Sequence, residues 1–250
     1  MAIRGVIFDL GHTLMHLDGT WAEVFARGAE DLVRFIKAHA PELDADAVAR
    51  IWLDRRRDGF VRAQETMREV TAEDSMRWSL AQCGLPDPSH GLLLGAIEAF
   101  FAYEEAHWAA DQEAALVLET LSDRGLRLGM VSNATHDPLI QRLVDRLGFR
   151  PWLDPALSSA STGIRKPDAA AFFPILVQWS LPARSVVVVG DTLDADVLGA
   201  KRAGMGAVWL RSRQDARQEG TASPYDSEGS ALPDASIDRI GELPVCLQNL

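Results

Sequence analysis

The chain is poor in cysteine and in positive charge, and it has no long apolar run. Its 250 residues include only two cysteines, Cys83 and Cys246, neither of which has a second thiol or a histidine at a zinc-ligand spacing. We therefore predict free thiols in a reducing compartment. With 25 basic and 36 acidic residues, the formal net charge is -11. This balance argues against electrostatic binding to nucleic acid or to an anionic membrane.

Signals for export or membrane insertion are also lacking. The N-terminus enters a strand-like segment within three residues, which leaves no room for a basic region followed by an apolar signal core. No apolar run approaches the length that spans a bilayer. We expect a cytoplasmic protein, a monomer or a homodimer, that binds neither nucleic acid nor membrane.

Lysine is scarce, since Lys37, Lys166 and Lys201 are the only three. The position of each lysine is therefore more informative than usual. The remaining composition, 47% hydrophobic and 24% charged, is ordinary for a soluble globular protein. The length suits one large domain or a core domain with an insertion.

The pattern of apolar segments predicts a doubly wound parallel α/β sheet. Strand-like segments cover residues 3–9, 126–133, 185–191 and 206–210. The β-branched block from Val186 to Val189 does not alternate with polar residues, which is typical of a strand buried on both faces. Helical patterns over 138–147 and 168–179 alternate with these strands, as strand-helix-strand units require.

Residues 18–110 contain a series of helical patterns with a breaker at 84–88, and the first pattern begins with a capping box, Thr20 to Glu23. Further helices are predicted over 45–64, 71–82 and 89–108. We expect a helical cap domain over 18–110, inserted into an α/β core domain formed by 1–17 and 111–250. Such an insertion after the first strand lies above the carboxyl ends of the strands, where ligands bind. Residues 214–233, rich in Ser, Gly, Asp and Glu, indicate a surface loop, and 236–247 a last strand or turn and a short helix.

Polar side chains of complementary chemistry follow the predicted strands. Asp9 ends the first strand, Ser132 and Asn133 end the second, and Asp191 ends the third, with Asp196 close behind. Lys166 begins a later helical segment. Each alone has an ordinary explanation as a cap, a turn former or a surface residue. Together they bring carboxylates, a hydroxyl and an ammonium to one edge of the sheet.

This ordered set resembles the haloacid dehalogenase-like hydrolase superfamily, in the branch with a helical cap after the first strand. The resemblance covers essentially the whole length and implies a Rossmann-like core and hydrolysis of a small phosphorylated metabolite. It implies Asp9 as the nucleophile, with Ser132 and Lys166 holding the transferring phosphoryl group. It implies a Mg²⁺ ion as cofactor. The implied metal ligands are Asp9, the Gly11 carbonyl, Asp191 and Asp196, and the implied substrate-binding residues are Gly11, His12, Thr13 and Asn133.

Gly11 departs from the family's pattern. Phosphatases of this family usually have a second Asp two residues after the nucleophile, which protonates the leaving oxygen and then activates water. Loss of such a general acid-base costs about 10²–10⁴ in rate, so slow hydrolysis is expected unless the leaving group is good. His12 and His16 are chemically suited to replace it, although turn or capping duty is the more ordinary explanation for His12.

Two other functions stay open at this stage. Dehalogenases of the family also lack the second Asp, but they need no magnesium and do not keep the paired acids seen as Asp191 and Asp196. A phosphate-ligand binding protein with little or no turnover is the third possibility. In the relatives that cleave phosphonates a cap lysine forms a Schiff base, but Lys37 has polar neighbours and is expected to be solvated.

The predicted cap contains basic and aromatic clusters. Arg55 to Arg57 and Arg62 are first interpreted as a solvated helix face that pairs with neighbouring acids, and second as a subsite for another anionic group. A set of aromatic residues is interpreted first as cap core and second as substrate lining. It comprises Trp52, Trp78, Phe100, Phe101 and Trp108.

Overall fold

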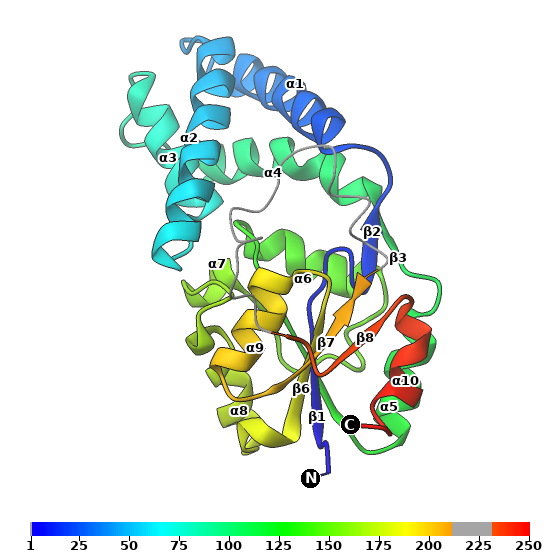
Figure 1. Ribbon diagram of the computed structural model, residues 1–250. Helices are drawn as coiled ribbons and strands as arrows, with labels where there is room; N and C mark the ends of the chain where they lie inside the picture. Colours follow the sequence, from blue (N-terminus) through cyan, green and yellow to red (C-terminus); the bar gives the residue numbers. More distant parts are fainter. Residues whose placement is uncertain (1, 212–231) are drawn as a thin grey trace.

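The computed structural model describes residues 2–211 and 232–250 (Figure 1). Its centre is a six-stranded sheet in the order β5-β4-β1-β6-β7-β8, with every neighbouring pair parallel. This topology confirms the predicted α/β class. The strands are β1 (Gly5–Phe8), β4 (Arg127–Ser132), β5 (Ala156–Ser158), β6 (Val186–Gly190), β7 (Gly206–Leu210) and β8 (Ala235–Ile237).

Both faces of the sheet are covered. In β1 the side chains of Val6 and Phe8 belong to one apolar cluster, while Ile7 belongs to the other. All three are fully buried, as the unbroken apolar sequence predicts. The helices of the core are α5 (Ala114–Asp123), α6 (Asp137–Arg146), α7 (Ser159–Thr162), α8 (Phe173–Trp179), α9 (Leu198–Arg202) and α10 (Leu243–Cys246).

Some elements differ from the prediction. The helix expected over 168–179 is split into a 3-10 turn, η1 (Ala169–Ala171), and α8, which has Pro174 in its first turn. Proline is favoured at the start of a helix because the backbone N–H that proline lacks would have no hydrogen-bond partner there. The three-residue strand β5 was not predicted, because so short a segment has no readable period. The expected loop over 214–233 lies almost entirely outside the described residues.

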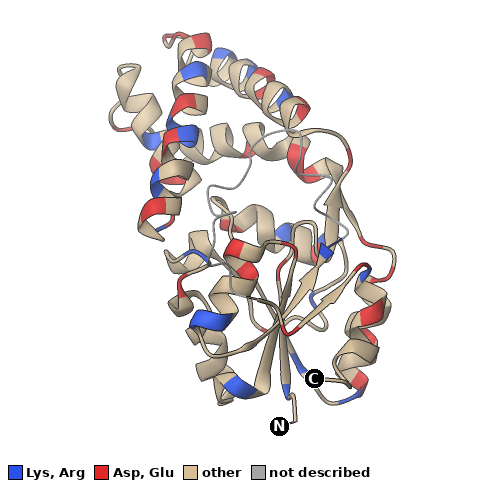
Figure 2. Cartoon of the chain, viewed as in Figure 1, with Lys and Arg blue, Asp and Glu red and all other residues tan. Residues whose placement is uncertain are grey.

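Four helices lie above the carboxyl ends of the strands (Figure 1). They are α1 (Trp21–His39), α2 (Ala45–Thr66), α3 (Ala72–Gln82) and α4 (His90–His107). The predicted capping box between Thr20 and Glu23 is present at the start of α1. Basic and acidic residues are interspersed along α1 and α2 (Figure 2).

A small antiparallel sheet joins the four helices to the core. Its strands are β2 (Met15–Leu17) and β3 (Trp108–Ala110), and each has only three residues. Strand β2 lies in the segment predicted to belong to the core, and β3 begins at Trp108, the last residue of the helix predicted over 89–108. The division of the chain into a cap domain over 18–110 and a core remains a prediction.

Ion pairs connect the helices above the sheet to the core. Arg142 on α6 contacts the carboxylates of Glu98 and Glu105 on α4 at 2.6 and 2.7 Å. Glu69 lies shortly after the end of α2. Its Oε2 accepts a hydrogen bond from Arg165 Nη1 at 2.6 Å, and both side chains are buried. The first connection comes from α4 and the second from the segment between α2 and α3. Among the described residues, no helix combines the length and apolar character that crossing a bilayer requires.

Helices α1 and α4 approach each other closely at Gly28. A β-carbon there would lie 2.5 Å from the carbonyl oxygen of Phe100, which is too close for a non-bonded contact between carbon and oxygen. Overpacking of this kind costs about 1–3 kcal/mol, so Gly28→Ala should lower the free energy of unfolding by that amount in urea denaturation. Gly91, in the first turn of α4, has open space around it. Gly91→Ala is the control, and equal stability of the two variants would contradict this packing.

Candidate active site

Asp9 stands at the carboxyl end of β1, where the chain leaves the sheet. Its backbone N–H donates to Val189 O at 2.9 Å, so β6 holds the residue beside the strand end. The chain then turns tightly, with Leu14 N donating to Leu10 O at 2.9 Å. Within this turn the buried Thr13 hydroxyl donates to Asp9 Oδ2 at 3.3 Å. The turn that follows the strand therefore fixes the orientation of the carboxylate.

Lys166 supplies positive charge to the carboxylates of Asp9 and Asp196. Its Nζ donates to Asp9 Oδ1 and to the carbonyl of Val131, each at 2.7 Å. It also lies 2.7 Å from Asp196 Oδ1, as an ion pair whose angles fall outside hydrogen-bond geometry. Burial disfavours the ammonium, but the charges of Asp196 and Asp9 outweigh it and raise the pKa of Lys166. The lysine is therefore a permanent cation between two acids.

Asn133 holds the backbone of Lys166. Its side-chain oxygen accepts from Lys166 N, and its amide nitrogen donates to Lys166 O, both at 2.9 Å. The substrate-binding role that the resemblance implies for Asn133 stays a prediction. The two contacts suit an asparagine, since its side chain carries both a donor group and an acceptor group.

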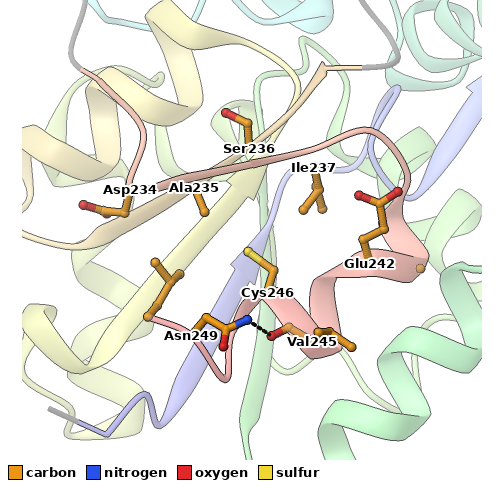
Figure 3. A pocket seen from close by; sticks show the side chains of 10 residues that line it. Asp234, Ala235, Ser236, Ile237, Glu242, Val245, Cys246 and Asn249 are labelled. Atoms are coloured by element: carbon orange, nitrogen blue, oxygen red, sulfur yellow. Dashed lines mark hydrogen bonds between the residues drawn. The ribbon is translucent and has the colours of Figure 1, made fainter.

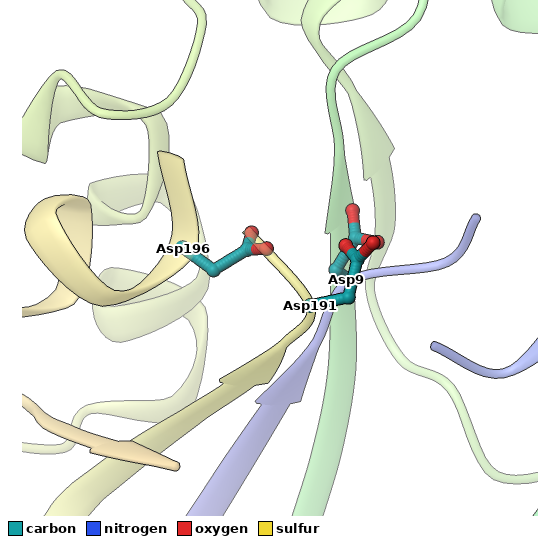
Figure 4. A group of neighbouring side chains, drawn as sticks. All are labelled: Asp9, Asp191 and Asp196. Carbon is teal, nitrogen blue, oxygen red and sulfur yellow. The ribbon is translucent and has the colours of Figure 1, made fainter. Parts of the chain in front are cut away.

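Three buried carboxylates meet at the strand ends (Figure 4). Asp9, Asp191 and Asp196 each offer an oxygen, and these oxygens lie within 4.8 Å of one another. Asp196 comes from the π-helical turn η3 (Leu193–Val197) and accepts from Thr192 N at 3.0 Å. A β-carbon at Gly190 would overlap the carboxyl group of Asp196. Position 190 therefore requires glycine, a requirement that sequence reasoning did not recognise.

The chemistry of this cluster fits a divalent cation. Three carboxylates and one ammonium leave two formal negative charges in a buried place. Burial raises the pKa of Asp196, an effect that Lys166 opposes and that the charge of Asp9 reinforces. Hard oxygen donors of this kind suit Mg²⁺, so Asp9, Asp191 and Asp196 could hold it.

Ser132 and Gly11 lie close to Asp9 in the fold. Ser132 ends β4, the strand next to β1, and is buried. At Gly11 an added β-carbon would meet the Trp108 ring at 3.4 Å, which is ordinary van der Waals contact. The His12 ring lies 5.4 Å from the Trp108 ring, and His12 has a positive φ of 60°. The Trp108 indole thus lies beside the position where the family's phosphatases carry their second acid.

The structure places His16, considered as a replacement for the missing acid, and Lys37, considered for a Schiff base. His16 lies on β2, and its Nε2 is 3.4 Å from Asp18 Oδ1. Lys37 pairs with Asp46 at 3.4 Å on the exposed surface of the cap. The solvated interpretation of Lys37 is confirmed.

The interpretation of the arginine cluster as a solvated face is wrong for Arg56. Arg57 is exposed and pairs with Asp54, as expected, but the Arg56 guanidinium lies among aromatic rings with a buried Nη1. The periodicity of α2 shows no apolar face there that could have revealed this. Among the predicted cap-core aromatics, all but Trp78, which is 42% exposed, are buried.

A separate surface pocket of about 690 Å³ lies between β8 and α10 (Figure 3). Ile237 and Cys246 contribute to its wall. None of the predicted site residues lines it. Cys83 and Cys246 are both free thiols, as predicted.

Comparison with known proteins places this geometry in a family. A ribulose-1,5-bisphosphate 5-phosphatase from Halopiger xanaduensis is 32% identical over 167 residues, which cover 64% of this chain and 65% of that protein, just under two thirds of its length. A phosphoserine phosphatase from Thermus thermophilus is 30% identical over 210 residues, which cover 83% of this chain and 81% of that protein.

Solved structures show the same fold. A 2-haloacid dehalogenase from Pseudomonas syringae pv. Tomato DC3000 superposes with a TM-score of 0.71 at 30% identity and covers 99% of both chains. A family model for hydrolases, described as haloacid dehalogenase-like hydrolase, matches residues 3–204. The chain therefore belongs to the haloacid dehalogenase-like hydrolases.

Proposed function

We propose that this hydrolase is a magnesium-dependent phosphatase of small phosphorylated metabolites that works through a phosphorylated Asp9. The observation that carries the proposal is the buried cluster in which Lys166 pairs with Asp9 while Asp191 and Asp196 complete an acidic triad. Relatives named as phosphatases of phosphorylated sugars and of phosphoserine support it.

In the first half-reaction, an oxygen of Asp9 attacks phosphorus, and the bond from phosphorus to the leaving oxygen breaks with its electron pair. The Lys166 ammonium offsets the charge that gathers near Asp9, and the Ser132 hydroxyl can donate to a phosphoryl oxygen. A bound Mg²⁺ would supply further positive charge for the phosphate. In the second half-reaction, water attacks the phosphorylated Asp9 and releases inorganic phosphate.

Protonation of the leaving oxygen is the weak point of this site. Position 11 offers only a backbone, so no carboxylic acid stands two residues after the nucleophile. We therefore propose a slow phosphatase, or one whose substrate has a leaving group that needs little protonation.

A 2-haloacid dehalogenase is the second candidate, favoured by Gly11 and by the similarity to a solved dehalogenase. The acidic triad argues against it, because displacement of halide by a carboxylate needs no divalent cation, and three buried carboxylates would repel an anionic acid. Release of halide from a 2-chloro acid in the presence of EDTA would favour this candidate. A phosphate-ligand binding protein would instead bind tightly without releasing phosphate in long incubations, which calorimetry and a phosphate assay distinguish.

The proposed nucleophile is tested by Asp9→Asn. The wild-type protein should release phosphate from p-nitrophenyl phosphate only with Mg²⁺ present, and Asp9→Asn should lower kcat by at least about 10³-fold, because the attacking carboxylate is gone. Asp46→Asn, on the exposed cap surface, is the control. Magnesium-dependent turnover that survives Asp9→Asn would refute the proposal.

The proposed metal site is tested at Gly190, which is not itself a ligand. Gly190→Ala would displace the Asp196 carboxylate and should weaken Mg²⁺ binding by at least about tenfold, as loss of ligand positioning does. Isothermal titration calorimetry measures this directly, and Gly91→Ala should bind as the wild type does. Unchanged Mg²⁺ affinity in Gly190→Ala would remove Asp196 from the ligand set.

The missing acid is tested by Gly11→Asp. A β-carbon at position 11 would be in van der Waals contact with Trp108, and the phosphatase proposal predicts an unchanged or higher kcat on alkyl phosphates, with a gain of up to about 10²-fold. Gly11→Asn, of equal size but without an acid, is the control and should gain nothing. A clear loss in Gly11→Asp that Gly11→Asn does not share would show that the glycine serves another chemistry.

A further inference from the structure

Arg56 on α2 is held in a cage of aromatic rings. Its guanidinium carbon lies 4.8 Å from the centre of the Phe101 ring and 4.9 Å from that of Phe100. The rings of Trp52 and Phe25 follow at 5.3 and 5.9 Å. Contacts at these distances are cation–π interactions. They favour the cation but provide no hydrogen-bond acceptor.

No anion completes this site among the described residues. Arg56 Nη1 is buried and has no hydrogen-bond partner, and no described acid lies within the 4.0 Å of an ion pair. Glu104 and Glu69 are close enough to act on Arg56 electrostatically. However, Glu104 accepts from Trp108 Nε1 at 3.3 Å, and Glu69 pairs with Arg165.

Leaving the buried Nη1 of a guanidinium without an acceptor is costly. Burial lowers the pKa of Arg56 to about 10, against the opposing effects of Glu104 and Glu69, and at this value the group is still charged at neutral pH. An anion that enters the cage would therefore meet a desolvated cation with open donors. Interactions of this kind are stronger than those on the surface.

The cage faces the core. Its Phe101 ring stacks on the His136 ring at 5.0 Å, and His136 follows shortly after Ser132 and Asn133. On the other side Phe25 stacks on Trp21 at 5.9 Å, and Trp21 contacts Trp108, the ring beside Gly11. Two chains of ring contacts thus join the surroundings of Arg56 to residues that lie near the Asp9 site in sequence or space.

The side of the cage toward α1 is open to solvent. Phe25 is 38% exposed and Trp21 is 40% exposed, whereas Phe100 and Trp52 are fully buried. An entering molecule would thus reach Arg56 along partly exposed aromatic rings. These rings suit the apolar or ring-shaped body of an organic anion.

We propose that Arg56 binds a second oxyanion of the phosphorylated substrate, a carboxylate or a second phosphate. Its planar fork of donors can bind two oxygens at once, which an ammonium cannot do. The proposal rests on the proposed phosphatase function for the first phosphate, and it restricts the substrates to molecules with two anionic groups. Arg57, one residue on, is exposed and paired with Asp54, so it provides a matched control.

Binding tests the inference apart from turnover. With Mg²⁺ present, calorimetry compares phenylphosphonate with 4-phosphonobenzoate and with 1,4-phenylenediphosphonate, none of which can be hydrolysed at the P–C bond. Wild-type protein should bind one or both two-anion probes more tightly than phenylphosphonate, by about 10- to 100-fold for a charged hydrogen-bonded contact. Which probe gains shows whether a carboxylate or a phosphate is the partner.

Variants assign the preference to Arg56. Arg56→Met should remove most of it, Arg56→Lys should keep part of it, and Arg57→Met should leave it unchanged. Thermal unfolding of each variant shows whether the cap still folds. If Arg56→Met does not fold, the inference is still tested by the wild-type preference for the two-anion probes and by the reduced preference expected of Arg56→Lys.

Two results would overturn the inference: no preference in the wild-type protein, or a preference that persists in folded Arg56→Met. Phosphate release from 4-carboxyphenyl phosphate and from phenyl phosphate is measured in parallel. An Arg56-dependent binding preference without any phosphate release would reject the phosphatase proposal and leave the Arg56 site standing. Release from both esters with equal kcat/KM and no binding preference would do the reverse.

Discussion

The buried ion pair between Lys166 and Asp9 is the interaction on which the candidate site depends. Without the ammonium, Asp9 and Asp196 would face each other as uncompensated charges in a buried place. Several contacts hold the lysine in this position. Asn133 holds its backbone on both sides, and the Val131 carbonyl takes a third contact. The side chains proposed to bind a phosphate and a cation are therefore held in place by the fold.

Much of this could be predicted from sequence, for definable reasons. Strands buried on both faces have unbroken apolar runs, and the polar residue after each run marks the edge where a site forms. Asp9 and Asp191 were found in this way and Lys166 through the family resemblance, and the structure brings the three together. Gly190 was missed because its requirement comes from a side chain six residues later that folds back through a π-helical turn. The β2 and β3 strands were missed because three residues carry no period.

Arg56 shows a different limit of sequence reasoning. A run of three arginines predicts a solvated helix face, and this prediction is correct for Arg57. The neighbouring residue differs because α4 brings Phe100 and Phe101 against α2 at that turn. This contact between segments more than forty residues apart leaves no local trace in either segment. Side chains that face a partner helix can be located only once the helices are packed.

Trp108 connects access to the site with its shape. It begins β3, one of the two strands that join the helices to the core, and its ring also lies beside Gly11 and against Trp21. Rotation of the four helices about β2 and β3 would therefore carry one wall of the reaction chamber with it. Such a rotation would change the space beside Asp9 as well as the access of solvent to it. A glycine at position 11 leaves room for that wall to move.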